Sequence, residues 1–235
     1  MSSTRLPGKV MMEIGGKPSL GYMINRVKQS KKIDDIVIAT TTNEADTKIV
    51  EYAKTLEGIH CTRGSESDVM GRVIKAGEEY EADIIVELTG DCPLIDPNII
   101  DKAINLFLDN DVEYVSNVDI RSYPDGMDVQ VMKLSTLIDS YKNTESALER
   151  EHVTLNIRKN KNKYRRIDMI AEKEVFWPNL GLTLDEREDL QFLRLIVGRL
   201  GKRGEIATCQ DIVNLLLEEK KLLLINQNVM RKGDT

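Results

Sequence analysis

Three short segments of this sequence combine residue types that can hold phosphate groups or a divalent cation. The first, residues 2–9, contains small hydroxyl side chains, Gly8 and the two cations Arg5 and Lys9. Backbone N–H groups beside a glycine can approach phosphate oxygens, and the cations add positive charge. The spacing does not match the Walker phosphate-binding pattern. From composition alone, an ordinary polar chain terminus explains such a segment more often than a binding site does.

The other two segments each place an aspartate next to an apolar run. Asp91 follows the run Ile84–Leu88, so we expect it at the carboxyl edge of a sheet, where a carboxylate can hold Mg²⁺ together with substrate phosphates. A turn ahead of Pro93 explains Asp91 equally well. Asp185 ends the run Leu182–Leu184, which predicts a short strand. Taken alone, Asp185 fits a helix N-cap better than a metal ligand.

Alternating apolar strands and amphipathic helices must position these segments. Strands are predicted at 36–39, 59–61, 84–88 and 114–115, and helices at 49–56, 69–80 and from Asp96-Pro97 onward. The alternation predicts a doubly wound, mainly parallel α/β sheet that binds ligands at the carboxyl ends of its strands.

The pattern is less regular in the second half of the chain. Residues 129–132 alternate in polarity and predict an exposed edge strand, a charged helix is predicted at about 147–158, and residues 206–224 form a leucine-rich helical ending. No internal repeat or low-complexity tract divides the sequence. We therefore predict one domain over residues 1–200 and a C-terminal helical tail over 201–235. This tail packs on the domain or on a partner subunit, and a homodimer is expected.

Bulk composition excludes several classes of partner. The net charge of −6 gives no indication of nucleic-acid or anionic-membrane binding, and no apolar run approaches the roughly 18 residues of a membrane span. Three widely separated cysteines argue against a disulfide framework and favour a reducing, cytoplasmic compartment. The two histidines are not at zinc-ligand spacing from a cysteine pair.

A series of motifs in a fixed order carries a family resemblance. They are S-S-T-R-L-P-G-K-V from Ser2, E-I-G-G-K-P from Glu13, D-D-I-V-I-A-T-T from Asp34, R-G-S-E-x-D-V from Arg63, T-G-D-C-P-L-I-D from Thr89, S-N at Ser116, P-D-G-M-D-V from Pro124, E-R-E-H-V-T from Glu149 and L-D-E-R-E-D-L from Leu184. Together they resemble the cytidylyltransferases of the spore coat polysaccharide biosynthesis protein F type, which are similar to CMP-Kdo synthetase and CMP-sialic acid synthetase.

The resemblance implies a nucleotide-diphospho-sugar transferase-like fold and a Mg²⁺-dependent reaction. In this reaction CMP passes from CTP to the hydroxyl of a sugar, expected to be acidic, with release of pyrophosphate, for surface polysaccharide or glycan synthesis. The implied catalytic residues are Arg5, Lys9 and Asp91, and the implied metal ligands are Asp91 and Asp185. The implied nucleotide-binding residues are Ser2, Ser3, Arg5, Gly8, Lys9, Arg63, Ser65, Asp68 and Gly90. The implied acceptor-binding residues are Asp125, Asp128, Arg150 and His152.

One departure from the family pattern concerns the beginning of the chain. Family members usually have a hydrophobic strand and an arginine-containing turn just before S-S-T-R, and Met1 aligns with the end of that turn. We therefore expect this sequence to lack the first, central strand and one phosphate-binding arginine. A truncated homologue without turnover, acting as a nucleotide-binding or dimer partner, is one alternative function. The other is a glycosyltransferase or another nucleotidyltransferase of the same fold, although the D-x-D motif of glycosyltransferases is absent around Asp91.

Overall fold

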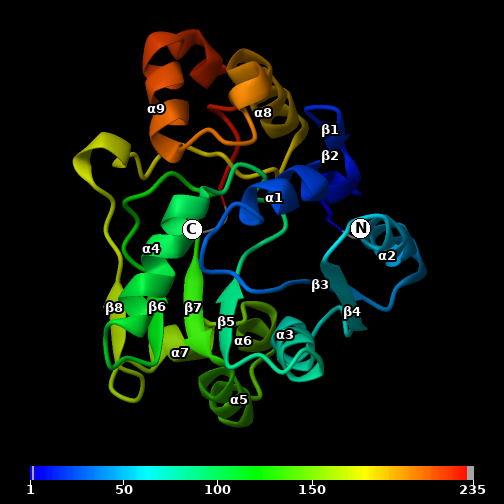
Figure 1. Ribbon diagram of the computed structural model, residues 1–235, viewed down its shortest axis with the longest axis vertical. Helices are drawn as coiled ribbons and strands as arrows, with labels where there is room; N and C mark the ends of the chain where they lie inside the picture. The colour runs from blue at the N-terminus through cyan, green and yellow to red at the C-terminus, as the bar shows by residue number, and fades with distance from the viewer. Residues whose placement is uncertain (2, 232–235) are drawn as a thin grey trace.

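The strands belong to three separate sheets in the computed structural model, which describes Met1 and residues 3–231 (Figure 1). A short antiparallel pair joins β1 (Glu13–Ile14) to β2 (Lys17–Pro18). A parallel pair joins β3 (Ile36–Thr41) to β4 (Ile59–Gly64). A four-stranded sheet has the order β5–β7–β6–β8, with bounds β5 (Ile84–Glu87), β6 (Tyr114–Ser116), β7 (Gln130–Lys133) and β8 (Arg166–Asp168).

Helices follow most of the strands, as the alternation predicted. Their bounds are α1 (Ser19–Val27), α2 (Thr47–Lys54), α3 (Val69–Glu79), α4 (Pro97–Leu108), α5 (Leu134–Lys142), α6 (Ala147–Glu151), α7 (Leu155–Lys159), α8 (Arg187–Leu200) and α9 (Cys209–Glu218). The predicted start of α4 is confirmed, because Asp96 accepts the backbone N–H of Asn98 at 2.8 Å and Pro97 occupies the first turn. None of the described helices is long and apolar enough to cross a membrane.

Both faces of the four-stranded sheet are covered. Val115 and Val131 lie in the core with α4, whereas Tyr114 and Met132 point to the opposite face and pack with α3, α5 and α7. Successive strand residues point to opposite faces, so β6 and β7 contribute to both layers. The α/β fold prediction is therefore confirmed, although β7 runs antiparallel to both of its neighbours.

The predicted exposed edge strand at 129–132 is wrong. β7 is central, paired with β5 on one side and β6 on the other. The polar side chain of Gln130 suggested exposure, but it is buried and satisfied by hydrogen bonds. Its Oε1 accepts from the hydroxyl of Tyr114 at 2.7 Å and from that of Thr154 at 2.5 Å, and its amide donates to Glu87.

Three further element predictions need correction. Residues 182–184 do not form a strand; the described pairing there is an isolated bridge between Asp125 and Gly181. The helix predicted at 147–158 is interrupted at Val153, whose φ of 30° is incompatible with a continuous right-handed helix. The helical ending predicted from residue 206 begins only at Cys209. Thr208 is the N-cap of this helix, and its side chain and that of Asp211 form a capping box.

In the described part of the chain, β3 pairs with β4 and β5 pairs with β7. Each of the two strands β3 and β5 therefore has a second edge with no strand paired to it among the described residues. The apolar residues of both strands are only half-buried for most of their length.

Residues 201–231 pack against the rest of the molecule. Ile212 and Leu216 of α9 are fully buried in the same core as Phe192 and Ile196 of α8. Leu217 and Leu224 are at least half exposed. The expected homodimer stays a prediction.

Candidate active site

The ammonium group of Lys9 lies between the two predicted metal-binding aspartates. Its Nζ atom donates to Oδ2 of Asp91 at 2.7 Å and to Oδ1 of Asp185 at 3.0 Å. Nη2 of Arg5 reaches the same Oδ1 of Asp185 at 2.8 Å. Residues from positions 5 to 185 therefore converge on one point, and two cations there face two carboxylates.

Backbone hydrogen bonds fix the positions of both aspartates. Asp91 follows β5, as expected from the sequence, and its carbonyl accepts the N–H of Leu184 at 2.8 Å. This bond ties the segment after β5 to the segment that carries Asp185. Oδ2 of the buried Asp189 accepts the backbone N–H groups of Asp185 at 3.1 Å and Glu186 at 2.9 Å. The N-cap of α8 is Glu186 and not Asp185, so the side chain of Asp185 is left to face Lys9.

Charge complementarity decides the ionisation of this cluster. Burial opposes ionisation of Asp91, but the Lys9 ammonium outweighs burial and holds the pKa of Asp91 below its usual range. Burial likewise opposes the charged form of Lys9, and the attraction of Asp91 and then Asp185 outweighs it, so the pKa of Lys9 is raised. Lys9 and Asp91 are therefore both charged at neutral pH.

The two aspartates have the donor chemistry that Mg²⁺ requires. Mg²⁺ prefers oxygen ligands and is commonly held by one or two carboxylates, with water and substrate phosphates completing its shell. Oxygens of Asp91 and Asp185 already bracket a single cationic atom, Nζ of Lys9. No group of three or more metal-binding side chains is present among the described residues. The two carboxylates therefore fit a cation that is shared with a phosphate substrate.

Three more carboxylates surround this centre. The predicted acceptor residues Asp125 and Asp128 share one partner, because Nη1 of Arg121 lies 3.2 Å from Asp125 and 3.9 Å from Asp128. Burial raises the pKa of Asp128 to about 6. Glu87 was missed by the sequence analysis; burial raises its pKa to about 7, with Asp128 and Asp91 adding to the effect. Its position at the carboxyl end of an apolar strand was the signal that could have found it.

The N-terminal segment is shaped by a left-handed glycine. Gly8 has φ of 72° and precedes the 3-10 helix Lys9–Met11, and its N–H donates to the carbonyl of Met1 at 3.1 Å. The hydroxyl of Ser3 accepts the N–H of Leu6 at 3.4 Å, while Ser2 lies outside the described residues. Gly90, directly before Asp91, approaches the same segment: a Cβ there would lie 3.8 Å from Val10.

Other predicted site residues form a second cluster. Asp68 caps α3, accepts from the hydroxyl of Tyr141 at 2.7 Å and lies 3.3 Å from Nη1 of Arg150. Asp68 and Arg150, assigned to different substrates, thus contact each other. Ser65 accepts the N–H of Asp68 at 3.2 Å.

Two predicted residues have other surroundings. Arg63 on β4 donates to the carbonyls of Thr41 and Asn43, each at 2.7 Å, and so braces the loop after β3. His152 is exposed at the end of α6. No described hydrogen bond or ion pair joins either of them to Lys9, Asp91 or Asp185.

A model of the cytidylyltransferase family matches residues 1–221. This chain belongs to the cytidylyltransferase family. Spore coat polysaccharide biosynthesis protein SpsF of Bacillus subtilis is 34% identical over 223 residues, which cover 92% of this chain and 90% of SpsF. These matches make the chain an enzyme of the nucleotidyltransferase class.

Solved structures agree with this assignment. A cytidylyltransferase from Leptospira borgpetersenii superposes with a TM-score of 0.91 at 33% identity, covering 98% of this chain and 95% of that one. A CMP:2-keto-3-deoxy-manno-octonic acid synthetase complexed with CTP has a TM-score of 0.61 at 18% identity, covering 84% and 94%. The second likeness shows that this cytidylyltransferase shares the synthetase's fold.

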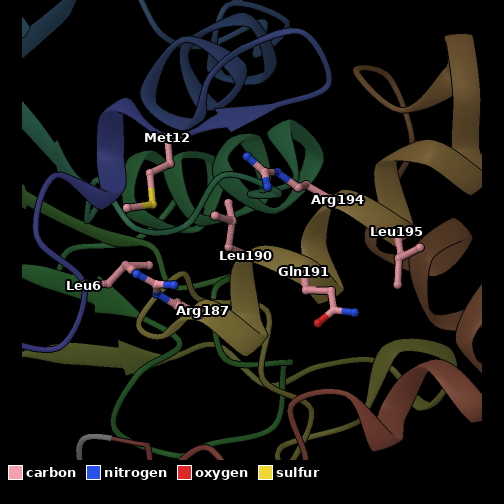
Figure 2. Close-up of a pocket in the computed structure, with 7 residues that line it drawn as sticks. All are labelled: Leu6, Met12, Arg187, Leu190, Gln191, Arg194 and Leu195. Carbon is pink, nitrogen blue, oxygen red and sulfur yellow. The ribbon is translucent and has the colours of Figure 1, made fainter.

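Two cavities of about 440 Å³ each lie in the described part of this cytidylyltransferase. Figure 2 shows the first, where Leu6 and Met12 from the N-terminal segment meet Leu190 and Arg194 of α8. Its lining is mostly apolar and includes none of the carboxylates around Lys9. The second is lined by Asp125 and by polar side chains from two further segments. Ligand sites combine apolar walls with a few convergent polar groups, and the second cavity meets this description.

Proposed function

We propose that this cytidylyltransferase catalyses the Mg²⁺-dependent transfer of CMP from CTP to a hydroxyl group of an acidic sugar, with release of pyrophosphate. The observation that carries the proposal is the position of Lys9, between two carboxylates suited to Mg²⁺ and next to Arg5. The family membership, and a structural neighbour solved with CTP, support the choice of nucleotide. The name of SpsF supports a role in surface polysaccharide synthesis.

The proposed reaction is a direct displacement at the α-phosphorus of CTP. The acceptor oxygen forms a bond to this phosphorus while the bond to the oxygen bridging the α- and β-phosphates breaks. The electron pair leaves with pyrophosphate, and the proton of the acceptor hydroxyl passes to water. Such a reaction needs alignment and charge stabilisation more than a protein nucleophile.

The chain's own residues supply that alignment. Arg5 and Lys9 are the cations that would bind the phosphates leaving as pyrophosphate. Asp91 and Asp185 would hold Mg²⁺, which supplies neutralisation of phosphate charge when it is bound. Cys92, although next to Asp91, is not a nucleophile in this scheme, because burial raises the pKa of its thiol well above its usual range.

Calorimetry and pyrophosphate release test the proposal together. We expect CTP with Mg²⁺ to bind more tightly than ATP, GTP or UTP, and pyrophosphate to be released with CTP and a sugar acid such as 3-deoxy-manno-octulosonate. The Asp91→Asn variant should lose turnover, whereas Asp109→Asn, a change at an exposed helix end, should retain it. Equal binding of all four triphosphates, or unchanged turnover in Asp91→Asn, would refute the proposal.

A further inference from the structure

The second cavity has no assigned ligand, and the chain's C-terminal segment forms one of its walls. The other walls are the loop that carries Arg121 and Asp125 and the segment that carries Trp177 and Gly181. In Figure 1 the red C-terminal chain returns from the region of α9 toward the middle of the molecule. We call residues 226–231 the C-terminal strap. We infer that this cavity is the acceptor subsite of the proposed reaction, and that the C-terminal strap binds a polyhydroxylated carboxylic acid there.

A short chain of hydrogen bonds links the lining of the cavity to the acidic centre. Nη1 of Arg231, which lines the cavity, donates to the hydroxyl of Thr183 at 2.9 Å. That hydroxyl in turn lies 3.3 Å from Oδ2 of Asp185, the carboxylate that faces Lys9. An acceptor in the cavity is therefore adjacent to the groups that would hold the triphosphate. This step rests on the proposed function.

The C-terminal strap is seated by specific contacts. Asn226 donates to the carbonyl of Gly181 at 3.1 Å and to Oδ1 of Asp189 at 2.9 Å, and Arg231 donates to the same Oδ1 at 2.7 Å. Gly181 leaves space for the guanidinium, because a Cβ at this position would lie 2.3 Å from its atoms. The absence of a side chain at Gly181 is thus a requirement for the position of Arg231.

The strap also contacts the residues that would bind the nucleotide. Nη1 of Arg5 donates to the carbonyl of Met230 at 2.9 Å, while Nη2 of Arg5 contacts Asp185. Asp189 uses its second oxygen to hold the backbone of Asp185. Occupation of the cavity and occupation of the triphosphate site are therefore linked through Arg5 and Asp189.

The lining chemistry selects the class of ligand. Two guanidinium groups, of Arg121 and Arg231, can pair with a carboxylate, and both are already held in place by Asp125 and Asp189. The side-chain amides of Asn226, Gln227 and Asn179, which line the cavity, can form hydrogen bonds with the hydroxyl groups of a ligand. The half-buried indole of Trp177 offers an apolar surface to the C–H face of a sugar ring. A sugar acid satisfies all three requirements.

Trp177 makes the cavity directly observable, because it is the only tryptophan in the chain. We would titrate the intact protein with 3-deoxy-manno-octulosonate and with glucuronate while following tryptophan fluorescence, with glucose as the uncharged control. We expect a saturable change with the sugar acids, and at least tenfold weaker binding in Arg231→Gln and in Gly181→Ala. The second variant displaces the guanidinium without altering Arg231 itself. Lys202→Gln, an exposed change away from the cavity, should behave like the wild type.

Calorimetric binding of CTP, measured on the same samples, separates the two proposals. Binding of CTP without a fluorescence response to either sugar acid would overturn the subsite and leave the proposed function standing. A fluorescence response without CTP binding would show that the cavity binds a sugar acid, but it would overturn both the proposed function and the role of the cavity as its acceptor subsite. Equal sugar-acid affinity in the wild type, Arg231→Gln and Gly181→Ala would overturn the role of the C-terminal strap.

Discussion

Nζ of Lys9 lies 2.7 Å from Oδ2 of Asp91, so an ammonium group stands where a divalent cation would contact the same carboxylate. The two cations cannot share this position. Lys9 is therefore expected to move toward the phosphates when Mg²⁺ and nucleotide bind. Its ammonium group would then exchange the carboxylate of Asp91 for the phosphates of the nucleotide. In the absence of substrate, Lys9 prevents repulsion between Asp91 and Asp185.

Replacing Lys9 with methionine should make stability depend on Mg²⁺. Without the ammonium, two partly buried carboxylates face each other, and added Mg²⁺ should raise the Tm of Lys9→Met more than that of the wild type. Turnover should fall by about 100-fold or more, because a charge-stabilising donor is lost. Thermal melts with and without Mg²⁺ measure the effect. Lys102→Met, which breaks a surface pair with Glu172, is the matched control. An equal Mg²⁺ response in Lys9→Met and the wild type would contradict the shared position.

Asp189→Asn should weaken Mg²⁺ binding although it replaces neither of the two proposed metal ligands, Asp91 and Asp185. The buried carboxylate of Asp189 positions the backbone of Asp185 and accepts from Arg231. Removing its charge should lower the apparent affinity for Mg²⁺ by about tenfold, as outer-shell changes commonly do. Turnover titrated against Mg²⁺ would show this as a shifted midpoint with a partly retained maximum. A lower maximum at an unchanged midpoint would instead indicate general structural damage.

Arg26→Met should destabilise the protein without removing any of the residues around Lys9. The fully buried guanidinium of Arg26 donates to the carbonyls of Ile95 at 2.9 Å, Gly204 at 2.8 Å and Ala207 at 2.7 Å. Methionine fills similar space but leaves these carbonyls unpaired, so we expect a loss of about 3 kcal/mol in the free energy of unfolding. Urea unfolding measures the loss. Arg187→Met, at an exposed position, should change it by less than about 0.5 kcal/mol.

Stability should fall as pH rises from about 4 to 7. Burial raises the pKa of Asp128 from 3.8 to about 6 and that of Glu87 from 4.5 to about 7. In this window the folded protein keeps protons that the unfolded chain has released, so each rise in pH favours unfolding. Asp91 acts in the opposite direction, because its lowered pKa makes its contribution disappear as the pH falls below the usual carboxylate range.

Variants test which carboxylates cause this pH dependence. Urea unfolding at pH 4.5 and 7.5 should show a smaller difference in Asp128→Asn and in Glu87→Gln than in the wild type. Each removed group should flatten the dependence by up to about 1.4 kcal/mol per pH unit. The same difference in all three proteins would show that other groups are responsible. Asp109→Asn serves as an exposed carboxylate control.

Local signals in the sequence were sufficient for the main strands and helices between residues 36 and 116, although α1 was not predicted. Strand β5 is apolar at every position except Glu87, and Asp96-Pro97 combines an N-cap with the preferred first helical residue, so both were predicted correctly. The same local order placed Asp91 at the end of β5. The convergence of Lys9 with Asp91 and Asp185 followed only from the family resemblance, since 176 residues separate Lys9 from Asp185.

Residues satisfied by long-range partners could not be predicted in this way. Gln130 has the polarity of an exposed strand position, and its burial depends on Tyr114, Thr154 and Glu87. Arg231 looks like a charged tail residue until Gly181 and Asp189 are placed around it. Such positions are decided by which elements pack together, which a local pattern does not contain.

Labelled CTP provides the most direct test of CMP transfer. The intact protein would be incubated with Mg²⁺, 3-deoxy-manno-octulosonate or another sugar acid that changes Trp177 fluorescence, and CTP labelled at either the α- or the γ-phosphate. We predict that the α-label appears in the sugar product and the γ-label in pyrophosphate, in equal amounts, and that Asp91→Asn abolishes both. Folded protein that binds CTP and the sugar acid but leaves the α-label in CTP, CDP or free CMP would contradict the account.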